Sequence, residues 1–226
     1  MYYENIEPAI FLERPNRFVA WVETHAGREI CHVKNTGRCR ELLVPGAEIY
    51  VQRNDNPARK TPLDLITVRK GTRLINMDSQ VPNRVAAQWV LDSGFVSKQA
   101  VVKGEKNFGN SRFDLYIEDG KRKIFMEVKG VTLEDNGVVR FPDAPTERGV
   151  KHLKELTAAR AEGYEAAVLF VIQMEQVLYL EPNDRTHAAF GQALRQAAEA
   201  GVQVLAIDCQ IKPDEIVPGK LVKVCL

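Results

Sequence analysis

The chain has 226 residues, of which 45% are hydrophobic and 27% charged, as in an ordinary folded protein of one large or two small domains. Its formal net charge of +1 excludes a bulk electrostatic attraction to nucleic acid, so any nucleic-acid surface has to come from local clusters of basic residues. No apolar run is long enough to cross a membrane, the acidic N-terminus is unlike a signal peptide, and the four cysteines form no C-x-x-C pair, so we expect a cytoplasmic protein with no membrane partner and no structural zinc.

The first eighty residues contain short runs in which apolar and polar residues alternate, separated by glycine-containing turns. These runs predict strands over residues 17–23, 30–34, 47–52, 63–69 and 73–76. Five short strands in a segment of this length predict an OB-like β-barrel, and we assign it residues 1–80. Such barrels often bind oligonucleotides, although the fold alone does not establish that function.

Basic side chains cluster in two loops of this barrel and are candidates for contacts to a phosphate backbone. The string HVKNTGR, residues 32–38, places bases around a glycine turn, and a second basic pair follows in the next long loop. The candidates are Lys34, Arg38, Arg40, Arg59 and Lys60. The alternative is that these loops are charged only because they are solvated.

From Pro82 onward the pattern changes to helices that alternate with strands. Helices are predicted over residues 83–92, from a Thr146 cap through Glu162, and over 185–200, and strands over residues 100–103, 138–141, within 164–173, and over 202–207. We therefore assign residues 81–226 to an α/β (α+β) domain in which helices flank a mixed sheet.

The most informative segment is SRFDLYIEDGKRKIFMEVK, residues 111–129, which reads as two alternating strands joined by a turn at Asp119-Gly120. If Glu118 pairs with Lys123, then Asp114 lies opposite Glu127. A loop of any even length keeps both acids on one face of the sheet, because side chains repeat every two residues. Lys129 shares that face with Glu127.

Two carboxylates on one face can hold a hard divalent cation, and a neighbouring lysine can orient an attacking water. Asp114, Glu127 and Lys129 are therefore candidate catalytic residues. The metal, Mg²⁺ or Mn²⁺, would bind Asp114 and Glu127, with Glu105 as an extra ligand. The alternative is a surface hairpin with a plain cross-strand ion pair. The order of helix, antiparallel strands and crossover helix also matches the core of the PD-(D/E)xK nucleases.

After the hairpin, the string FPDAPTERGVKHL leads into the next helix. Arg148 and His152 are four residues apart and share a helix face, and Lys151 lies beside them. The amide groups of a helix N-terminus also favour anions, so these residues are candidate phosphate contacts. Arg112, at the start of the hairpin, joins the candidate nucleic-acid-binding residues.

Taken together, these segments resemble the sugar fermentation stimulation protein A (SfsA) family. The matching strings are HVKNTGR at 32–38, GNSRFD at 109–114, EVKGVTL at 127–133 and FPDAPTERGVKHLKEL at 141–156. The resemblance covers nearly the whole chain. It implies a bacterial or archaeal cytoplasmic DNA-binding protein linked to the regulation of sugar metabolism, notably of maltose, with an OB-like domain followed by a PD-(D/E)xK-like domain.

The chain departs from this family pattern in the first helix of the second domain, where related sequences often carry acids and this chain has Ala87 and Gln88. Three functions remain open: a Mg²⁺-dependent DNA nuclease, a non-catalytic DNA-binding regulator, and an RNA-directed nuclease. Association into a homo-oligomer is compatible with each of them.

Overall fold

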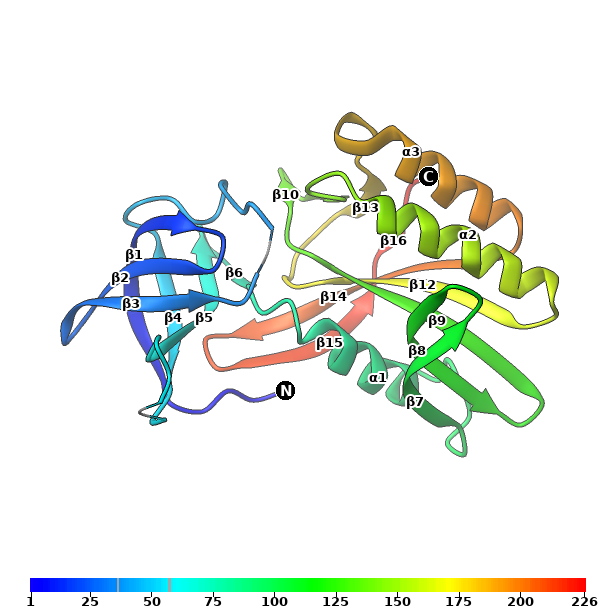
Figure 1. The fold of residues 1–226 in the computed structure, drawn as a ribbon, viewed down its shortest axis with the longest axis horizontal. Coiled ribbons are helices and arrows are strands. Elements are labelled where there is room, and N and C mark those ends of the chain that lie inside the picture. The colour runs from blue at the N-terminus through cyan, green and yellow to red at the C-terminus, as the bar shows by residue number, and fades with distance from the viewer. Residues whose placement is uncertain (36, 57) are drawn as a thin grey trace.

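The computed structural model describes residues 1–35, 37–56 and 58–226, in which a β-barrel lies beside a layered α/β unit (Figure 1). The N-terminal strands are β1 (Ile6–Asn16), β2 (Val19–Thr24), β3 (Gly27–Val33), β4 (Glu48–Arg53), β5 (Leu63–Lys70) and β6 (Arg73–Asn76). They pair in the order β3-β2-β1-β4-β5, and a parallel pairing of β3 with β5 closes the barrel. This closed five-stranded barrel confirms the predicted OB-like domain.

Two details of the predicted barrel are wrong. Strand β1 was not predicted, because prolines at positions 8 and 15 and two irregularities after Phe11 break the alternation of its side chains. The predicted strand at 73–76 exists as β6, but among the described strands it pairs with the C-terminal half of β5, residues 67–70, and does not close the barrel. It leads instead toward the second unit.

The second unit is built on a six-stranded sheet with the order β15-β14-β12-β9-β8-β7. Its strands are β7 (Val101–Phe108), β8 (Ser111–Asp119), β9 (Arg122–Val131), β12 (Glu165–Ile172), β14 (Gln203–Lys212) and β15 (Glu215–Leu221). The pairs β9–β12 and β12–β14 are parallel and the other pairs antiparallel, so the sheet is mixed as predicted. A small second sheet contains β10 (Glu134–Asp135), β11 (Val138–Phe141), β13 (Tyr179–Pro182) and β16 (Lys223–Val224).

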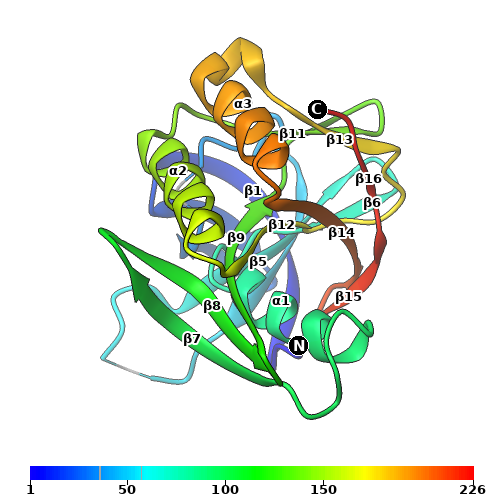
Figure 2. The ribbon, with the colours of Figure 1, turned by 90° about the vertical axis from the view of Figure 1, so that its right-hand side faces the viewer.

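Helices cover both faces of the large sheet (Figure 2). Helix α1 (Pro82–Asp92) packs on one face, and α2 (Glu147–Ala161) and α3 (Asp184–Glu199) pack on the other. The Thr146 side chain accepts a hydrogen bond of 3.0 Å from the Gly149 amide, which confirms the predicted N-cap of α2. Gly163, in the left-handed conformation that favours glycine, follows its end.

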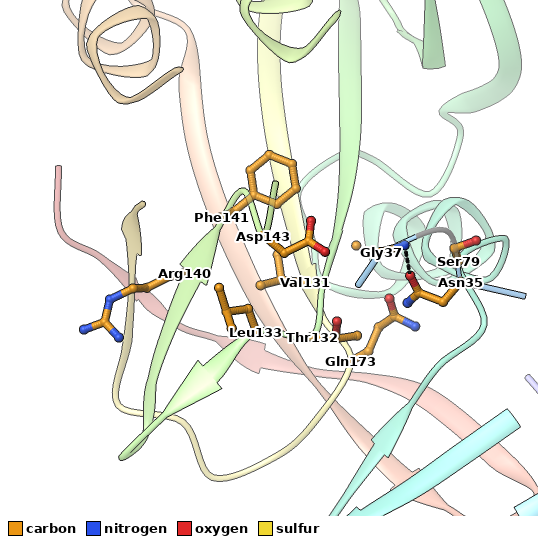
Figure 3. Close-up of a pocket in the computed structure, with 11 residues that line it drawn as sticks. Asn35, Gly37, Ser79, Val131, Thr132, Leu133, Arg140, Phe141, Asp143 and Gln173 are labelled. Atoms are coloured by element: carbon orange, nitrogen blue, oxygen red, sulfur yellow. Dashed lines mark hydrogen bonds between the residues drawn. The ribbon is translucent and has the colours of Figure 1, made fainter. Parts of the chain in front are cut away.

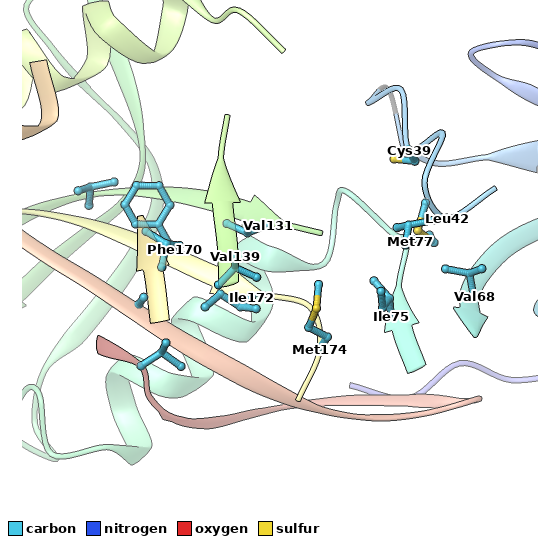
Figure 4. Close-up of a cluster of buried hydrophobic side chains, with 14 of the residues drawn as sticks. Cys39, Leu42, Val68, Ile75, Met77, Val131, Val139, Phe170, Ile172 and Met174 are labelled. Carbon is cyan, nitrogen blue, oxygen red and sulfur yellow. The ribbon is translucent and has the colours of Figure 1, made fainter. Parts of the chain in front are cut away.

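The barrel and the α/β unit share one apolar core (Figure 4). Buried side chains of the barrel side, including Ile75 and Met77, continue into those of the second unit, including Ile172 and Met174. The buried Gln173 side chain joins the units by donating from Nε2 to the carbonyl oxygens of Asn76 and Asp78, both at 3.0 Å. An interface that is both apolar and hydrogen-bonded holds the units in a fixed relative position.

The polypeptide also crosses between the units at its N-terminus. The amide of Tyr3 donates to the carbonyl of Asp214, and Tyr2 forms a β-bridge with Glu215. The first three residues therefore pair with β15 of the α/β unit, although they precede the barrel in sequence. Within the described parts of the chain, the helices lack the length and hydrophobicity that a membrane span needs.

Candidate functional site

The hairpin of β8 and β9 has the predicted register, with Glu118 opposite Lys123. The pairing runs from Asp119–Arg122 to Leu115–Met126 and stops there. Beyond that point the carboxylate of Asp114 replaces a strand carbonyl as the acceptor, because its Oδ2 accepts a 2.8 Å hydrogen bond from the amide of Val128. The end of the strand pairing therefore brings an acid of β8 onto β9 between the two other candidate residues, Glu127 and Lys129.

Glu127 is the buried centre of this site, with only 3% of its surface exposed. Its Oε1 atom receives both the Lys129 ammonium, at 2.5 Å, and the His152 ring through Nδ1. Burial opposes ionisation of Glu127, but these two partners outweigh it and hold the pKa of the carboxyl below its usual value. The other oxygen, Oε2, is buried and has no hydrogen-bond partner among the described residues.

Asp114 completes a pair of carboxylates. Its Oδ1 atom accepts a 3.0 Å hydrogen bond from the Asn83 side chain, in the first turn of α1. Burial and the negative charge of Glu127 raise the pKa of Asp114 above its usual value. The sequence argument missed Asn83. Its only signal was its place at a Pro-Asn helix start, and the contact exists because α1 packs across β8 and β9.

His152 has a different place from the one predicted. It is 4% exposed and packs edge-on against the Phe113 ring, and its Nδ1 faces Glu127. Arg148 donates from Nε to His152 Nε2 at 3.3 Å. Because an arginine only donates, Nε2 accepts and the ring proton lies on Nδ1. With both nitrogens engaged, His152 is not available to a phosphate, and the prediction of a direct contact is corrected to a contact with Glu127.

The other bases around the hairpin lie at the surface. Arg148, Lys151 and Arg112 are exposed, and Lys151 donates to the carbonyl of Asn110 at 2.6 Å. The proposed third metal ligand, Glu105, is exposed and lies 3.4 Å from Arg112. The structure does not bring it to the other two acids, because Glu105 has a positive φ of 52° and no paired residue on β8, and its side chain lies at the surface. Among the residues that the structure describes, no group of three or more acids, histidines or cysteines has the arrangement of a metal site.

The basic candidates of the barrel divide into two sets. Lys34 and Arg59 bind the buried carboxylate of Asp64, at 3.3 and 2.6 Å. Their charges are therefore compensated inside the protein, which argues against the predicted phosphate contacts. The exposed side chains of Arg38, Arg40 and Lys60 form no ion pair with any described residue and remain candidates.

A further arginine shapes the loop that carries two of these bases. The Arg14 guanidinium donates to the backbone carbonyls of residues 17, 35, 37 and 38, at 2.6 to 3.0 Å. Burial lowers the pKa of Arg14 from its usual value. Sequence reasoning missed this residue, because a lone arginine in an unpredicted strand gives no signal of its partners. Its contacts hold in place the loop that carries Arg38 and Arg40.

Comparisons with known proteins place these features in a family. The family model described as the SfsA N-terminal OB domain matches residues 12–77, and the sugar fermentation stimulation protein RE domain matches residues 80–215. The sugar fermentation stimulation protein homolog of Desulfitobacterium hafniense is 59% identical over 226 residues, which cover 100% of this chain and 99% of that protein. The homolog of Clostridium beijerinckii is 55% identical over 216 residues and 96% of each protein.

A solved structure agrees over the whole chain. The structure of Pyrococcus furiosus SfsA in complex with Ca²⁺ superposes with a TM-score of 0.88 at 27% sequence identity, covering 100% of this chain and 98% of that chain. The relative arrangement of barrel and α/β unit is therefore similar in the two proteins.

Proposed function

Because the chain belongs to the sugar fermentation stimulation protein family, we propose that it is a DNA-binding protein whose Asp114–Glu127–Lys129 site hydrolyses phosphodiesters with Mg²⁺ or Mn²⁺. One observation supports this most strongly. Glu127 is buried beside a second carboxylate, yet its Oε2 has no partner among the described residues. A buried carboxylate oxygen without a partner is costly, and a cation would satisfy it.

The two acids fit a hard divalent cation. Mg²⁺ is commonly held by one or two carboxylates, and waters and substrate phosphates supply its other ligands. The raised pKa of Asp114, which follows from burial and from Glu127, shows that the two negative charges disfavour each other. A cation between them removes this repulsion. The Pyrococcus furiosus relative was solved with Ca²⁺, another cation that prefers oxygen ligands, which supports the same preference here.

The metal, when bound, would neutralise charge on the phosphate and lower the pKa of a bound water. The Lys129 ammonium, within reach of Glu127, can orient that water and offset the charge that develops on the phosphate oxygens. His152 holds the Glu127 carboxylate from the other side, and Arg148 holds the His152 ring. These two are positioning residues. The exposed Lys151 and Arg112 are suited to contacts with flanking phosphates.

The order of elements supports the same reaction class. Helix α1 precedes a strand pair that carries the acids and lysine, and α2 crosses over to the parallel strand β12. PD-(D/E)xK nucleases share this order. The proposed DNA surface runs from Arg38 and Arg40 on the barrel loop to the first turn of α2.

The test compares cleavage and metal binding in two matched variants. Glu127→Gln keeps the side-chain size and removes the charge, and Glu118→Gln makes the same change at a half-buried position at the other end of the hairpin. Single-stranded, duplex and branched DNA and RNA are incubated with Mg²⁺ or Mn²⁺. Mutation of a residue that only holds a metal ligand in place typically lowers activity by about 10- to 100-fold. Glu127 is proposed as a ligand itself, so we expect Glu127→Gln to lower the cleavage rate on the order of 100-fold or more. Glu118→Gln should cleave like the unmodified protein.

Metal binding gives a readout that does not depend on cleavage. A saturating metal raises the free energy of unfolding by about 2.7 kcal/mol at 100 times its Kd. This stabilisation should be present in Glu118→Gln and absent in Glu127→Gln. The metal site would be contradicted if the unmodified protein showed no cleavage and no stabilisation by Mg²⁺, Mn²⁺ or Ca²⁺.

A non-catalytic DNA-binding regulator of sugar metabolism is the second candidate, and one observation favours it. Lys129 and His152 already neutralise Glu127 without a metal, and α1 carries Ala87 and Gln88 instead of a third acid. Binding of DNA that weakens steeply with salt, with no cleavage by either variant, would identify this function. Cleavage of RNA but not DNA would identify the RNA-directed alternative.

A further inference from the structure

A polar cavity of about 180 Å³ lies between the two units, at the end of the strand that carries Glu127 and Lys129 (Figure 3). Both units line it: Asn35 and Gly37 come from the barrel loop, and Gly130, Asp143 and Gln173 come from the α/β unit. A volume of this size equals that of about six water molecules at roughly 30 Å³ each. A space of this size can hold one small planar group.

The most informative group in the wall is the Gln173 amide, which is only 1% exposed. Its Nε2 donates to the backbone carbonyls of Asn76 and Asp78, which only accept, so the orientation of the amide is fixed. Its Oε1 therefore turns toward Gly130 and the cavity, and no described residue donates a hydrogen bond to it. An acceptor that opens onto a cavity and receives no hydrogen bond from a described residue is free to accept one from a bound group.

Two glycines keep this space open. A Cβ atom on Gly130 would lie 2.7 Å from Gln173 Oε1 and 2.8 Å from Pro82 Cγ. A Cβ atom on Gly37 would lie 2.5 Å from Asp143 Oδ2 and 2.9 Å from Asn35 Oδ1. Any larger residue at either position would displace the polar groups of the wall.

The charges of the wall exclude a phosphate. The Asp143 carboxylate faces the cavity, while the guanidinium of Arg140 points away from it and binds Glu181 at 2.7 Å (Figure 3). Asp143 and Gln173 offer acceptors, and the Asn35 amide offers donors beside the Oδ1 that accepts from Gly37. Acceptors and donors side by side in a small space match the Watson–Crick edge of a nucleobase, which is uncharged and carries amino and imino donors beside ring acceptors.

The cavity also lies where a DNA strand would pass. Glu127 and Val131 are four residues apart on β9, or roughly 13 Å at the rise of a strand. At about 3.4 Å per nucleotide along a duplex strand, this is the span of a few nucleotides. The exposed Arg38 follows the lining residue Gly37 in the barrel loop, and the exposed Arg40 lies two residues further on, so both can hold the neighbouring phosphates.

We propose that this cavity binds a single unpaired nucleobase of the DNA, displaced from the base stack close to the phosphodiester at Glu127. The inference rests on the proposed DNA-binding function. Such a site makes the protein selective for DNA that contains an unpaired or easily extruded base, because extruding a paired base costs more free energy.

The test uses one duplex in three forms: fully paired, with one unpaired base at its centre, and with an abasic nucleotide in place of that base. Binding is measured in EDTA, so that no cleavage occurs. The form with the unpaired base should bind roughly tenfold more tightly than the abasic form, a difference of about 1.4 kcal/mol. A fluorescent 2-aminopurine at the unpaired position should change its emission on binding.

The protein variants are Asp143→Asn, at the cavity wall, and Asp92→Asn, an equal change of charge at the exposed end of α1. The first should reduce the tenfold preference to less than about threefold, and the second should preserve it. Equal affinity of the unmodified protein for the base-containing and abasic forms would overturn the base site while DNA binding stands. Failure to bind all three forms would overturn the proposed function and the site with it.

Discussion

Two buried acids of this protein, Asp64 in the barrel and Glu127 in the α/β unit, have partners of the same kinds and differ in how completely those partners satisfy them. Each lies against a histidine and a lysine, with an arginine nearby. Asp64 uses both oxygens, because Arg59 reaches each of them, His32 binds Oδ1, and Asn54 and Lys34 bind Oδ2. Glu127 uses one oxygen for both partners and leaves the other without one.

The difference follows from the position of each acid in its sheet. Asp64 lies inside the seam where β3 pairs with β5, directly opposite His32, and the segments that follow β3 and β4 supply its other partners. Glu127 lies where β8 has left β9, and there the strand that would cover it is replaced by the Asp114 carboxylate. An acid whose two oxygens both have partners stabilises the fold. An acid that has one oxygen without a partner and lies beside a second carboxylate is suited to bind a ligand. The composition of the two clusters does not distinguish these roles.

The largest expected effect is a difference in the free energy of unfolding between variants of the two acids. Asp64→Asn removes the charge that compensates Lys34 and Arg59, and breaking a buried ion pair costs about 3–5 kcal/mol. We expect about 3 kcal/mol, because both bases remain partly exposed. Glu127→Gln keeps an acceptor for His152 and Lys129, removes the repulsion of Asp114 and leaves the Asp114 charge near Lys129, so its cost should be about 1 kcal/mol or less. Urea denaturation of both variants measures the difference. Equal costs would contradict the comparison.

A third buried acid, Glu134, gives an effect of intermediate size that depends on pH. It binds Lys70 and Arg73 of the barrel at 2.8 Å each. Burial opposes its ionisation, but these bases and the Gly137 amide lower the pKa of Glu134 to about 2 from 4.5. Because the folded protein holds the charged form, this stabilisation is complete above about pH 5 and is lost as the pH falls toward 2.

We expect Glu134→Gln to cost about 2 kcal/mol at pH 7 and much less near pH 2. Urea titrations of the unmodified protein and the variant across this range provide the test. A cost of Glu134→Gln that stays constant between pH 7 and pH 2 would show that the lowered pKa of Glu134 does not contribute to folding.

The smallest effect concerns the basic residues in the loops of the barrel. Each phosphate contact contributes about 0.9 to the slope of log K against log salt concentration, so Arg38→Ala and Arg40→Ala should each lower the slope for DNA binding by about 1. Arg59→Ala serves as the matched control, because Asp64 already compensates this arginine. Its slope should equal that of the unmodified protein. A fall in slope for Arg59→Ala alone would reverse the assignment of the two sets of bases.

Much of the fold could be predicted because it depends on local patterns. Alternation identified the strands β2 to β5 and the hairpin of β8 and β9, and the Thr146 cap and Gly163 marked the two ends of α2. Strand β1 was missed because its prolines and bulges break the alternation on which the prediction depends. Strands β13, β15 and β16 were missed as well. They are short or contain proline, and the pairing partners of β13 and β16 lie far away in sequence.

The sequence alone determined the family and the face shared by Asp114, Glu127 and Lys129, because side-chain parity in a hairpin depends only on the spacing of residues. Tertiary structure decided which charged groups are available. Lys34 and Arg38 are four residues apart, yet only Lys34 meets Asp64, because the closing pair of β3 and β5 brings that acid from another part of the chain. The open oxygen of Glu127 and the cavity beside Gln173 likewise exist only where distant segments pack together.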